Sequence, residues 1–301
     1  MVALWIPGKE DAVSYAIVTD SSCNLPDAVI EKYGLYILPL TFMADGEEFR
    51  SYTEGQKSDL KRFYTMMREG KVFTTSLPNQ GDAEALLRRL LDEGRDVLYI
   101  GFSSGLSGTC EAISGIMDRL RGEYPQRTLL AIDTYGASLG EGLMVYEACK
   151  LREDGADIRE AYDWVEANRF HVAHWFTVDD LMYLFRGGRV SRTSAWAGSL
   201  LNIKPVLHMD DAGHLVPMEK VRGRKKSIQR MFDHMRESAI EPVADQTVFI
   251  SHGDCEEEAE ALAKMIRDAY GCEVIINYVD PVIGAHSGPG TLALFFLADQ
   301  R

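Results

Sequence analysis

Short apolar runs alternate with amphipathic segments through the first half of the chain, and this alternation limits the possible folds more than any other feature. The apolar runs are typical of buried strands and occupy residues 15–20, 35–42, 96–102 and 128–133. The segments with helical spacing of apolar residues occupy 25–34, 58–70, 81–94, 108–122 and 138–153. Strands that alternate with helices predict a mostly parallel sheet with helices on its faces.

The pattern changes near residue 155. A helix at 157–169 and a strand at 171–178 are followed by a predicted hairpin at 204–221, a basic helix, and two strands that flank an acidic helix at 254–270. This order is typical of an α+β domain. We therefore predict an N-terminal α/β domain over residues 1–155, with an extension over about 1–14, and a C-terminal α+β domain over 156–301.

Composition excludes several functional classes. The 301 residues carry a formal net charge of −14, which argues against nucleic acid or an anionic membrane surface as a partner. The five cysteines are scattered, with no metal-binding spacing, which favours reduced core thiols over a disulfide framework. The N-terminus is too short and charged for a signal peptide, and no apolar run is long enough to span a bilayer. We expect a soluble, cytoplasmic protein without stable membrane insertion.

Hydroxyl-rich loops follow three predicted strands and precede one predicted helix. They occupy residues 19–22, 103–109, 133–138 and 74–78, and none contains lysine or arginine. Each hydroxyl could simply cap a helix. Because ligands of open parallel sheets bind beyond the carboxyl ends of the strands, the loops could also form one neutral donor site for a small anionic or polar group. A triphosphate is not expected, since the GxxxxGK[ST] motif is absent.

One of these loops also supports a competing interpretation. Residues 101–105 match GxSxG between a predicted strand and a predicted helix, the context of a nucleophile elbow. Ser103 would then be the nucleophile of a serine hydrolase acting on lipid esters, with His286 as its base. Against this hypothesis, the loop runs on to Thr109, and no oxyanion segment precedes it.

The segment GAHSGPGT, residues 284–291, is unusually rich in glycine for its apolar surroundings. It lacks the lysine and the spacing of a phosphate-binding loop. Its glycines, Gly284, Gly288 and Gly290, together with Pro289, predict a tight backbone path that would direct His286 toward a ligand.

Eight segments in this order resemble the DegV family, the fatty-acid-binding subunits of bacterial fatty acid kinase, over nearly the whole chain from about residue 16. The segments are VTDSSCNLP, LPL, TTSLP, SSGLSGT, DTYGASLGEG, VDDLMYLFRGGRVS with AGSLLNIKPVL, EKVRGRKKSI and GAHSGPGT. The resemblance implies a two-domain α/β protein that holds one long-chain fatty acid, such as palmitate or oleate, at the domain interface. It further implies a protein that is not itself an enzyme, with no metal and no cofactor of its own.

The resemblance also implies a role for individual residues. The carboxylate ligands would be Thr75, His286, and either Ser103 or Ser104, presented to a separate ATP-dependent kinase that forms acyl phosphate for phospholipid synthesis. A site of neutral donors without a cation would leave the carboxylate free to attack a phosphoryl group. The loops that support this site would contribute Asp20, Ser21, Ser107, Gly284, Gly288 and Gly290. Leu77 and Asn79 depart from the family pattern TSQPS, which leaves the acyl preference open.

The dense basic cluster at residues 222–226 has two interpretations. It is either a solvated helix start or, as the resemblance suggests, a docking surface for the kinase through Arg222, Arg224 and Lys225. The RGGR segment at 186–189 is expected to form a turn that leads into a helix at Ser191. His171 and His174 fall on opposite faces of a predicted strand, which argues against a metal site there.

Overall fold

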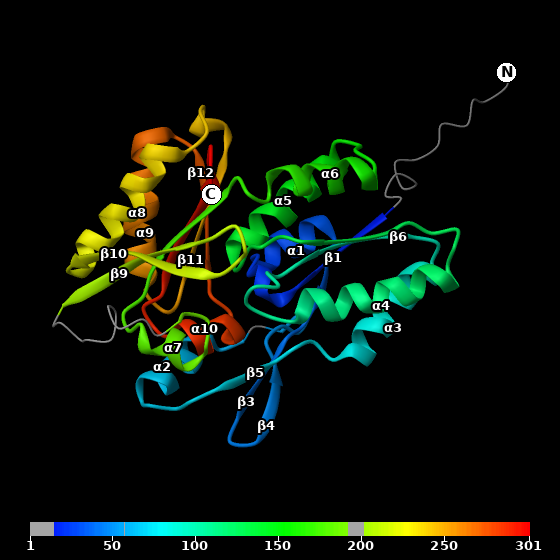
Figure 1. Cartoon of the computed structure of the whole chain (residues 1–301), viewed down its shortest axis with the longest axis horizontal. Coiled ribbons are helices and arrows are strands. Elements are labelled where there is room, and N and C mark those ends of the chain that lie inside the picture. Colours follow the sequence, from blue (N-terminus) through cyan, green and yellow to red (C-terminus); the bar gives the residue numbers. More distant parts are fainter. Residues whose placement is uncertain (1–14, 57, 192–201) are drawn as a thin grey trace.

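The computed structural model describes residues 15–56, 58–191 and 202–301. The first half builds a four-stranded parallel sheet with the strand order β2-β1-β6-β7 (Figure 1). The predicted parallel sheet with flanking helices and a second, α+β sheet region is confirmed. Its strands are β1 (Tyr15–Asp20), β2 (Tyr36–Leu38), β6 (Asp96–Gly101) and β7 (Leu129–Asp133).

Helices cover both faces of the parallel sheet, which explains why its strands are apolar without alternation. Val18 packs in a cluster with residues of the helices on one face, and its neighbour Ile17 packs in a second cluster on the other. The first cluster is built with α3 (Gln80–Asp92) and α4 (Thr109–Glu123), and the second with α1 (Asp27–Tyr33), α5 (Leu139–Glu153) and α6 (Ile158–Asn168).

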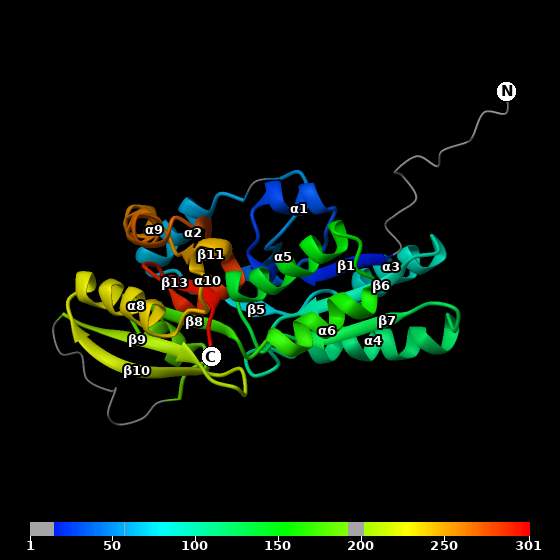
Figure 2. The same ribbon diagram turned by 90° about the horizontal axis from the view of Figure 1, so that it is seen from above.

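The second half builds a six-stranded sheet with the order β10-β9-β8-β13-β11-β12. β11 and β12 pair in parallel, and the other neighbours pair antiparallel. Its strands are β8 (Val172–Thr177), β9 (Ile203–Met209), β10 (Leu215–Arg222), β11 (Thr247–His252), β12 (Glu273–Tyr278) and β13 (Leu292–Leu297). One face packs on α8 (Arg224–Ser238) and α9 (Glu256–Tyr270), and the other on α5. Both views show α5 where the two sheets meet (Figures 1 and 2).

A small antiparallel sheet, with the order β4-β3-β5, was not predicted. The expected strand at 35–42 is divided: β2 ends at Leu38, and the chain enters β3 (Thr41–Ala44) of the small sheet. Pro39, which has no N–H to donate, lies at the division. The expected loop around Thr75 is also wrong, because residues 74–76 form β5, which pairs with β3. The remaining elements here are β4 (Glu47–Arg50) and α2 (Leu60–Arg68).

The segment around His286 is helical rather than a simple bend. Residues 281–287 form α10, which begins with Pro281 and contacts α2, β5 and α7 (Met182–Arg186). The Asp280 carboxylate accepts hydrogen bonds from the Ile283 and Val282 N–H groups at its start. The predicted glycine-dependent path is found only after the helix, where Gly288 and Gly290 have φ of 84° and 77°.

The predicted boundary near residue 155 stays a prediction. The strands of the parallel sheet lie between residues 15 and 133, and those of the six-stranded sheet between 172 and 297. Between them, α6 packs on β6 and β7 of the first sheet, although the predicted division would assign it to the second domain. The predicted extension over about residues 1–14 lies outside the described residues, and so does the helix expected after Ser191.

Buried hydrogen bonds join the two larger sheets. Ser138, which precedes α5, donates to Asn24 Oδ1 at 2.8 Å and lies 2.9 Å from the Ser251 hydroxyl on β11. Asn277 on β12 donates to the Asn24 carbonyl at 2.8 Å. His174 Nε2 on β8 accepts the Ala137 N–H at 3.2 Å. We call these contacts the inter-sheet joint.

No helix in the described ranges is both long and apolar enough to cross a membrane. The same ranges contain no group of three or more histidine, cysteine, aspartate or glutamate side chains placed to hold a metal ion. All five cysteines are unpaired, and Cys255 alone among them is not fully buried.

Gly140→Ala is expected to destabilise the protein by at least about 2 kcal/mol. A Cβ at Gly140 would lie 2.1 Å from His174 Nε2, so the joint would have to separate. The matched control is Gly115→Ala in the middle of α4, where a Cβ meets nothing within 4 Å. The control should be neutral or stabilising by up to about 1 kcal/mol. Urea unfolding measures both, and equal free energies of unfolding for the two variants would contradict the role of the joint.

Candidate functional site

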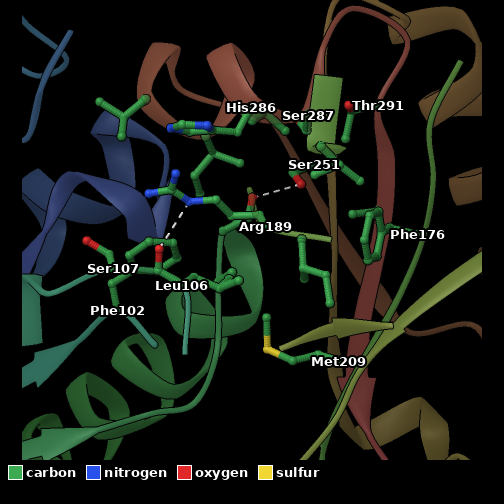
Figure 3. A pocket seen from close by; sticks show the side chains of 18 of the residues that line it. Phe102, Leu106, Ser107, Phe176, Arg189, Met209, Ser251, His286, Ser287 and Thr291 are labelled. Carbon is green, nitrogen blue, oxygen red and sulfur yellow. Dashed lines mark hydrogen bonds between the residues drawn. The ribbon is translucent and has the colours of Figure 1, made fainter. Parts of the chain in front are cut away.

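A cavity of about 190 Å³ lies where the two larger sheets and the small sheet meet (Figure 3). Its wall is formed by residues of strands β5, β8, β9, β11 and β13, of helix α10, and of the loop that follows β6. Most of these side chains are apolar, including Leu40, Phe102, Phe176, Met209, Ile283 and Phe295. Such a space suits an apolar ligand, with polar side chains at a few positions to orient it.

Two predicted ligand residues meet at the wall of this cavity. Thr75 Oγ1 and His286 Nε2 are hydrogen-bonded at 2.7 Å, although the residues are 211 positions apart in the sequence. Pairing of β5 with β3 fixes Thr75 opposite Phe42. His286 lies in the last turn of α10, whose start is capped by Asp280. The structure thus brings a hydroxyl and an imidazole together at the wall of a mostly apolar cavity.

His286 is a neutral imidazole at physiological pH. Burial, reinforced by the nearby Arg189 guanidinium, lowers the pKa of His286 to about 4. A neutral imidazole has one N–H donor and one acceptor nitrogen. Gly187 packs against the ring, because a Cβ there would lie 2.4 Å from His286 Nδ1. The ring is therefore held in place and can offer a single hydrogen bond donor to an anion.

Arg189 lines the same cavity and was missed as a site residue (Figure 3). Its Nε donates to the Leu106 carbonyl at 3.2 Å, and its Nη1 donates to the Gly187 carbonyl. Burial lowers the pKa of Arg189, but a guanidinium stays charged in proteins. The expectation of a site without a cation is therefore wrong. The signal was present in the RGGR segment, which was interpreted only as a turn.

Ser103 and Ser104 do not line the cavity. The Ser103 hydroxyl is fully buried, donates to the Gly213 carbonyl at 2.9 Å and accepts the Gly105 N–H at 3.2 Å. Ser104 is exposed, and its backbone N–H points to the Asp133 carboxylate at 3.2 Å. A role of either serine in binding the carboxylate therefore stays a prediction. For Ser103, this role would require its hydroxyl to break the hydrogen bond to the Gly213 carbonyl and to bond the ligand instead.

The same contacts weaken the hydrolase hypothesis. A nucleophile needs an exposed hydroxyl and a base within hydrogen-bonding distance. The Ser103 hydroxyl is buried against Gly213, and the hydrogen-bond partner of His286 Nε2 is Thr75. No contact in the described structure supports Ser103 as a nucleophile.

The predicted supporting residues hold the loops rather than line the cavity, except for Ser107. Asp20 accepts hydrogen bonds from the Ser22 and Phe102 N–H groups and from the Tyr99 hydroxyl, which fixes the loop after β6. Burial raises the pKa of Asp20. Ser21 bonds the Ser51 hydroxyl at 2.6 Å and accepts the Leu40 N–H.

Ser107 lines the cavity and bonds the Thr109 hydroxyl at 2.9 Å.

The three glycines of the 284–291 segment allow close packing around His286. A Cβ at Gly284, Gly288 or Gly290 would lie within 2.5 Å of Tyr64, Tyr183 or Asp179, respectively.

A second, outer pocket of about 330 Å³ adjoins the first. The two share Thr75, Arg189 and His286 in their walls, so this trio separates an apolar interior from a more polar exterior. The outer pocket adds Lys71 and Arg186, and no described carboxylate lines it. One of its cations, Lys71, pairs with the exposed Asp45 at 2.5 Å. In a chain of net charge −14, this pocket is locally basic.

The basic cluster after β10 divides into two roles. Arg222 and Lys225 are exposed. Arg224 is not available as a docking residue, because its Nη2 donates to Glu258 at 2.7 Å and to the Gly290 carbonyl at 2.6 Å. Arg224 instead fixes the turn that follows α10.

Comparison with known proteins supports the resemblance. The model of the family described as "Uncharacterised protein, DegV family" matches residues 14–299. The chain belongs to the DegV family. A DegV domain-containing protein of Clostridium perfringens is 40% identical over 288 residues, which cover 95% of this chain and 98% of that protein. A DegV domain-containing protein of Streptococcus pyogenes is 35% identical and covers 96% of this chain and 99% of its own length.

Solved structures of the DegV family share the fold. The fatty-acid-binding DegV family protein of Thermus thermophilus has a TM-score of 0.84 at 28% identity, covering 95% of this chain and 99% of that one. DegV of Bacillus subtilis, described as a fatty acid binding protein, has a TM-score of 0.81 at 30% identity and covers 95% of this chain and 100% of its own.

Arg189→Gln is expected to raise the pKa of His286 from about 4 toward its ordinary value without reaching it, because burial is the larger cause of the shift. The ring resonances of His286, followed by NMR as a function of pH, measure this change. Arg186→Gln is the control, since the pKa of His286 responds to Arg189 and not to Arg186. An identical titration of His286 in the wild type and the Arg189 variant would show that the guanidinium does not act on the ring.

Proposed function

We propose that this chain binds one long-chain fatty acid, such as palmitate or oleate, and presents its carboxylate to an ATP-dependent fatty acid kinase. The observation that carries the proposal is the Thr75–His286 hydrogen bond at the wall of a mostly apolar cavity. The alkyl chain would fill the apolar interior, and the carboxylate would replace or share this hydrogen bond. The DegV family proteins of Thermus thermophilus and Bacillus subtilis are described as fatty-acid-binding proteins.

The chemistry of the head group supports binding of a carboxylate. A carboxylate accepts hydrogen bonds only, and charge-assisted bonds of this kind are the stronger ones. Thr75 offers a hydroxyl donor, neutral His286 offers one N–H, and Arg189 offers guanidinium N–H groups. The backbone carbonyls of Leu106 and Gly187 already occupy part of the guanidinium, so Arg189 attracts the carboxylate without enclosing it.

The outer pocket supports presentation to a kinase. It shares Thr75, Arg189 and His286 with the cavity and adds Lys71 and Arg186, so a phosphoryl group approaching the carboxylate from outside would meet positive charge. Phosphoryl transfer depends mainly on positioning and on stabilisation of negative charge. The protein would therefore be a lipid-binding partner of the kinase rather than an enzyme. It would act in the cytoplasm, where ATP is available. The acyl phosphate formed by the kinase would serve phospholipid synthesis.

Mass spectrometry of the organic extract from natively purified, then denatured protein tests the binding. We expect close to one long-chain fatty acid per chain in the wild type and at least a tenfold lower content in the Thr75→Val and His286→Ala variants, because one or two charge-assisted hydrogen bonds are lost. Thr65→Val is the control, since its hydroxyl bonds the Lys61 carbonyl on the exposed surface of α2. An empty wild-type protein whose Ser103 reacts with a fluorophosphonate would overturn the proposal in favour of hydrolysis.

Charge reversal at Arg222 tests kinase docking. We expect Arg222→Glu to lower the rate of acyl phosphate formation by about tenfold or more while the fatty acid content stays unchanged, because an exposed charge at an interface acts mainly on association. Arg236→Glu, an exposed arginine near the other end of α8, is the control. Loss of bound fatty acid together with turnover would instead indicate a folding defect.

A further inference from the structure

A wall of hydroxyl groups faces the otherwise apolar cavity. Ser138, Ser251, Ser287 and Thr291 line it, and their exposed fractions are only 5%, 0%, 4% and 3%. Figure 3 shows Ser251, Ser287 and Thr291 near one another on the side of α10 and β13, with Ser107 on the opposite side of the cavity. An unsubstituted alkyl chain offers no hydrogen bond to such a wall.

Three of these hydroxyl groups have hydrogen-bond partners within the protein. Asn24 Nδ2 donates to the Ser21 carbonyl, which orients Asn24 Oδ1 toward Ser138. Because an amide oxygen can only accept, Ser138 donates to Asn24, and the Ser138 hydroxyl is also placed as a donor to Ser251 at 2.9 Å. Thr291 Oγ1 donates to the Gly288 carbonyl at 2.8 Å. Ser251 and Thr291 can each accept a further hydrogen bond, because a hydroxyl oxygen has two acceptor lone pairs.

Ser287 is the exception. Its Oγ is buried and has no hydrogen-bond partner. Buried hydroxyl groups are usually paired, and an unpaired one lowers stability. The wall thus combines one uncommitted hydroxyl, which can donate and accept, with two nearby acceptors.

We propose that the cavity selects a fatty acid that carries a hydroxyl group close to its carboxylate, with Ser287 as the residue that recognises this group. The inference rests on the proposed function, because it takes the carboxylate to lie at Thr75 and His286. Ser287 directly follows His286 in α10, and both residues line the cavity. The recognised hydroxyl is therefore on one of the first carbons of the chain. It accepts a hydrogen bond from Ser287 and donates one to Ser251 or Thr291.

The hydrogen bond between Ser287 and the ligand hydroxyl explains why a hydroxy acid is favoured and why an unsubstituted acid is disfavoured. A 3-hydroxy acid satisfies Ser287 and uses an acceptor of the wall, whereas an unsubstituted acid covers Ser287 with methylene groups and leaves it unpaired. Sites built to bond a ligand hydroxyl discriminate against the analogue that lacks it, because their own buried polar groups are then left without partners. A hydroxyl at the far end of the chain would not reach Ser287.

Competition binding against a fluorescent fatty acid tests the inference with three ligands of equal length: hexadecanoic, 3-hydroxyhexadecanoic and 16-hydroxyhexadecanoic acid. In the wild type we expect the 3-hydroxy acid to bind about fivefold more tightly than hexadecanoic acid, which corresponds to about 1 kcal/mol, the typical net effect of one hydrogen bond. The 16-hydroxy acid should show no such gain. Ser287→Ala should remove the preference and tighten binding of hexadecanoic acid, because no unpaired hydroxyl remains.

The control is Ser107→Ala, which removes a hydroxyl from the opposite side of the cavity, where it bonds Thr109. This variant should keep the preference for the 3-hydroxy acid. Equal affinities for hexadecanoic and 3-hydroxyhexadecanoic acid in the wild type would overturn the inference and leave fatty acid binding intact. Equal weakening of both acids by Ser287→Ala would also overturn it, because Ser287 would then contact the carboxylate itself. A wild-type protein that binds none of the three acids would overturn the proposed function.

Discussion

The hydrogen bonds of the inter-sheet joint set how the two larger sheets lie relative to each other, and the cavity lies between these sheets. Asn24 has a left-handed backbone with φ of 52°, its side chain accepts from Ser138, and its carbonyl accepts from Asn277. The Asp280 N–H also points to Asn24 Oδ1 at 3.4 Å, and Asp280 caps the helix that carries His286. Buried polar networks specify one arrangement because each unpaired group in them is costly. The position of His286 relative to the parallel sheet is thus set by the hydrogen bonds of Asn24 and by the Asp280 cap of α10.

Burial then determines the electrostatics of the site. It lowers the pKa of His286 to about 4 and also lowers that of Arg189, so the cavity presents a neutral imidazole beside one guanidinium. Burial acts in the other direction on acids: it raises the pKa of Asp280 to about 6. The lowered pKa of His286 means that stability rises with pH between about 4 and 6.5, since the unfolded chain binds more protons there.

The sequence predicted the larger elements and missed the smaller ones. Parallel strands buried on both faces are continuous apolar runs, so β1, β6 and β7 were predicted from the pattern of apolar residues alone. β5 was not found, because three polar residues pair as a strand only with β3 beside them. Arg189 was missed for the same kind of reason, since its contacts with Leu106 and His286 come from elements distant in the sequence. Arg224 was assigned to a surface, yet it holds the Gly290 turn.

The sequence by itself determined the alternation of strands and helices, the acidic net charge, and the segments that place the chain in the DegV family. These properties are local, because periodicity and motif spacing are written in neighbouring residues. Only the tertiary structure decided that Thr75 meets His286, that Arg189 accompanies them and that Ser287 faces the cavity without a partner. Such contacts join residues up to 211 positions apart, and they form only when the packing of three sheets and their helices brings those residues together.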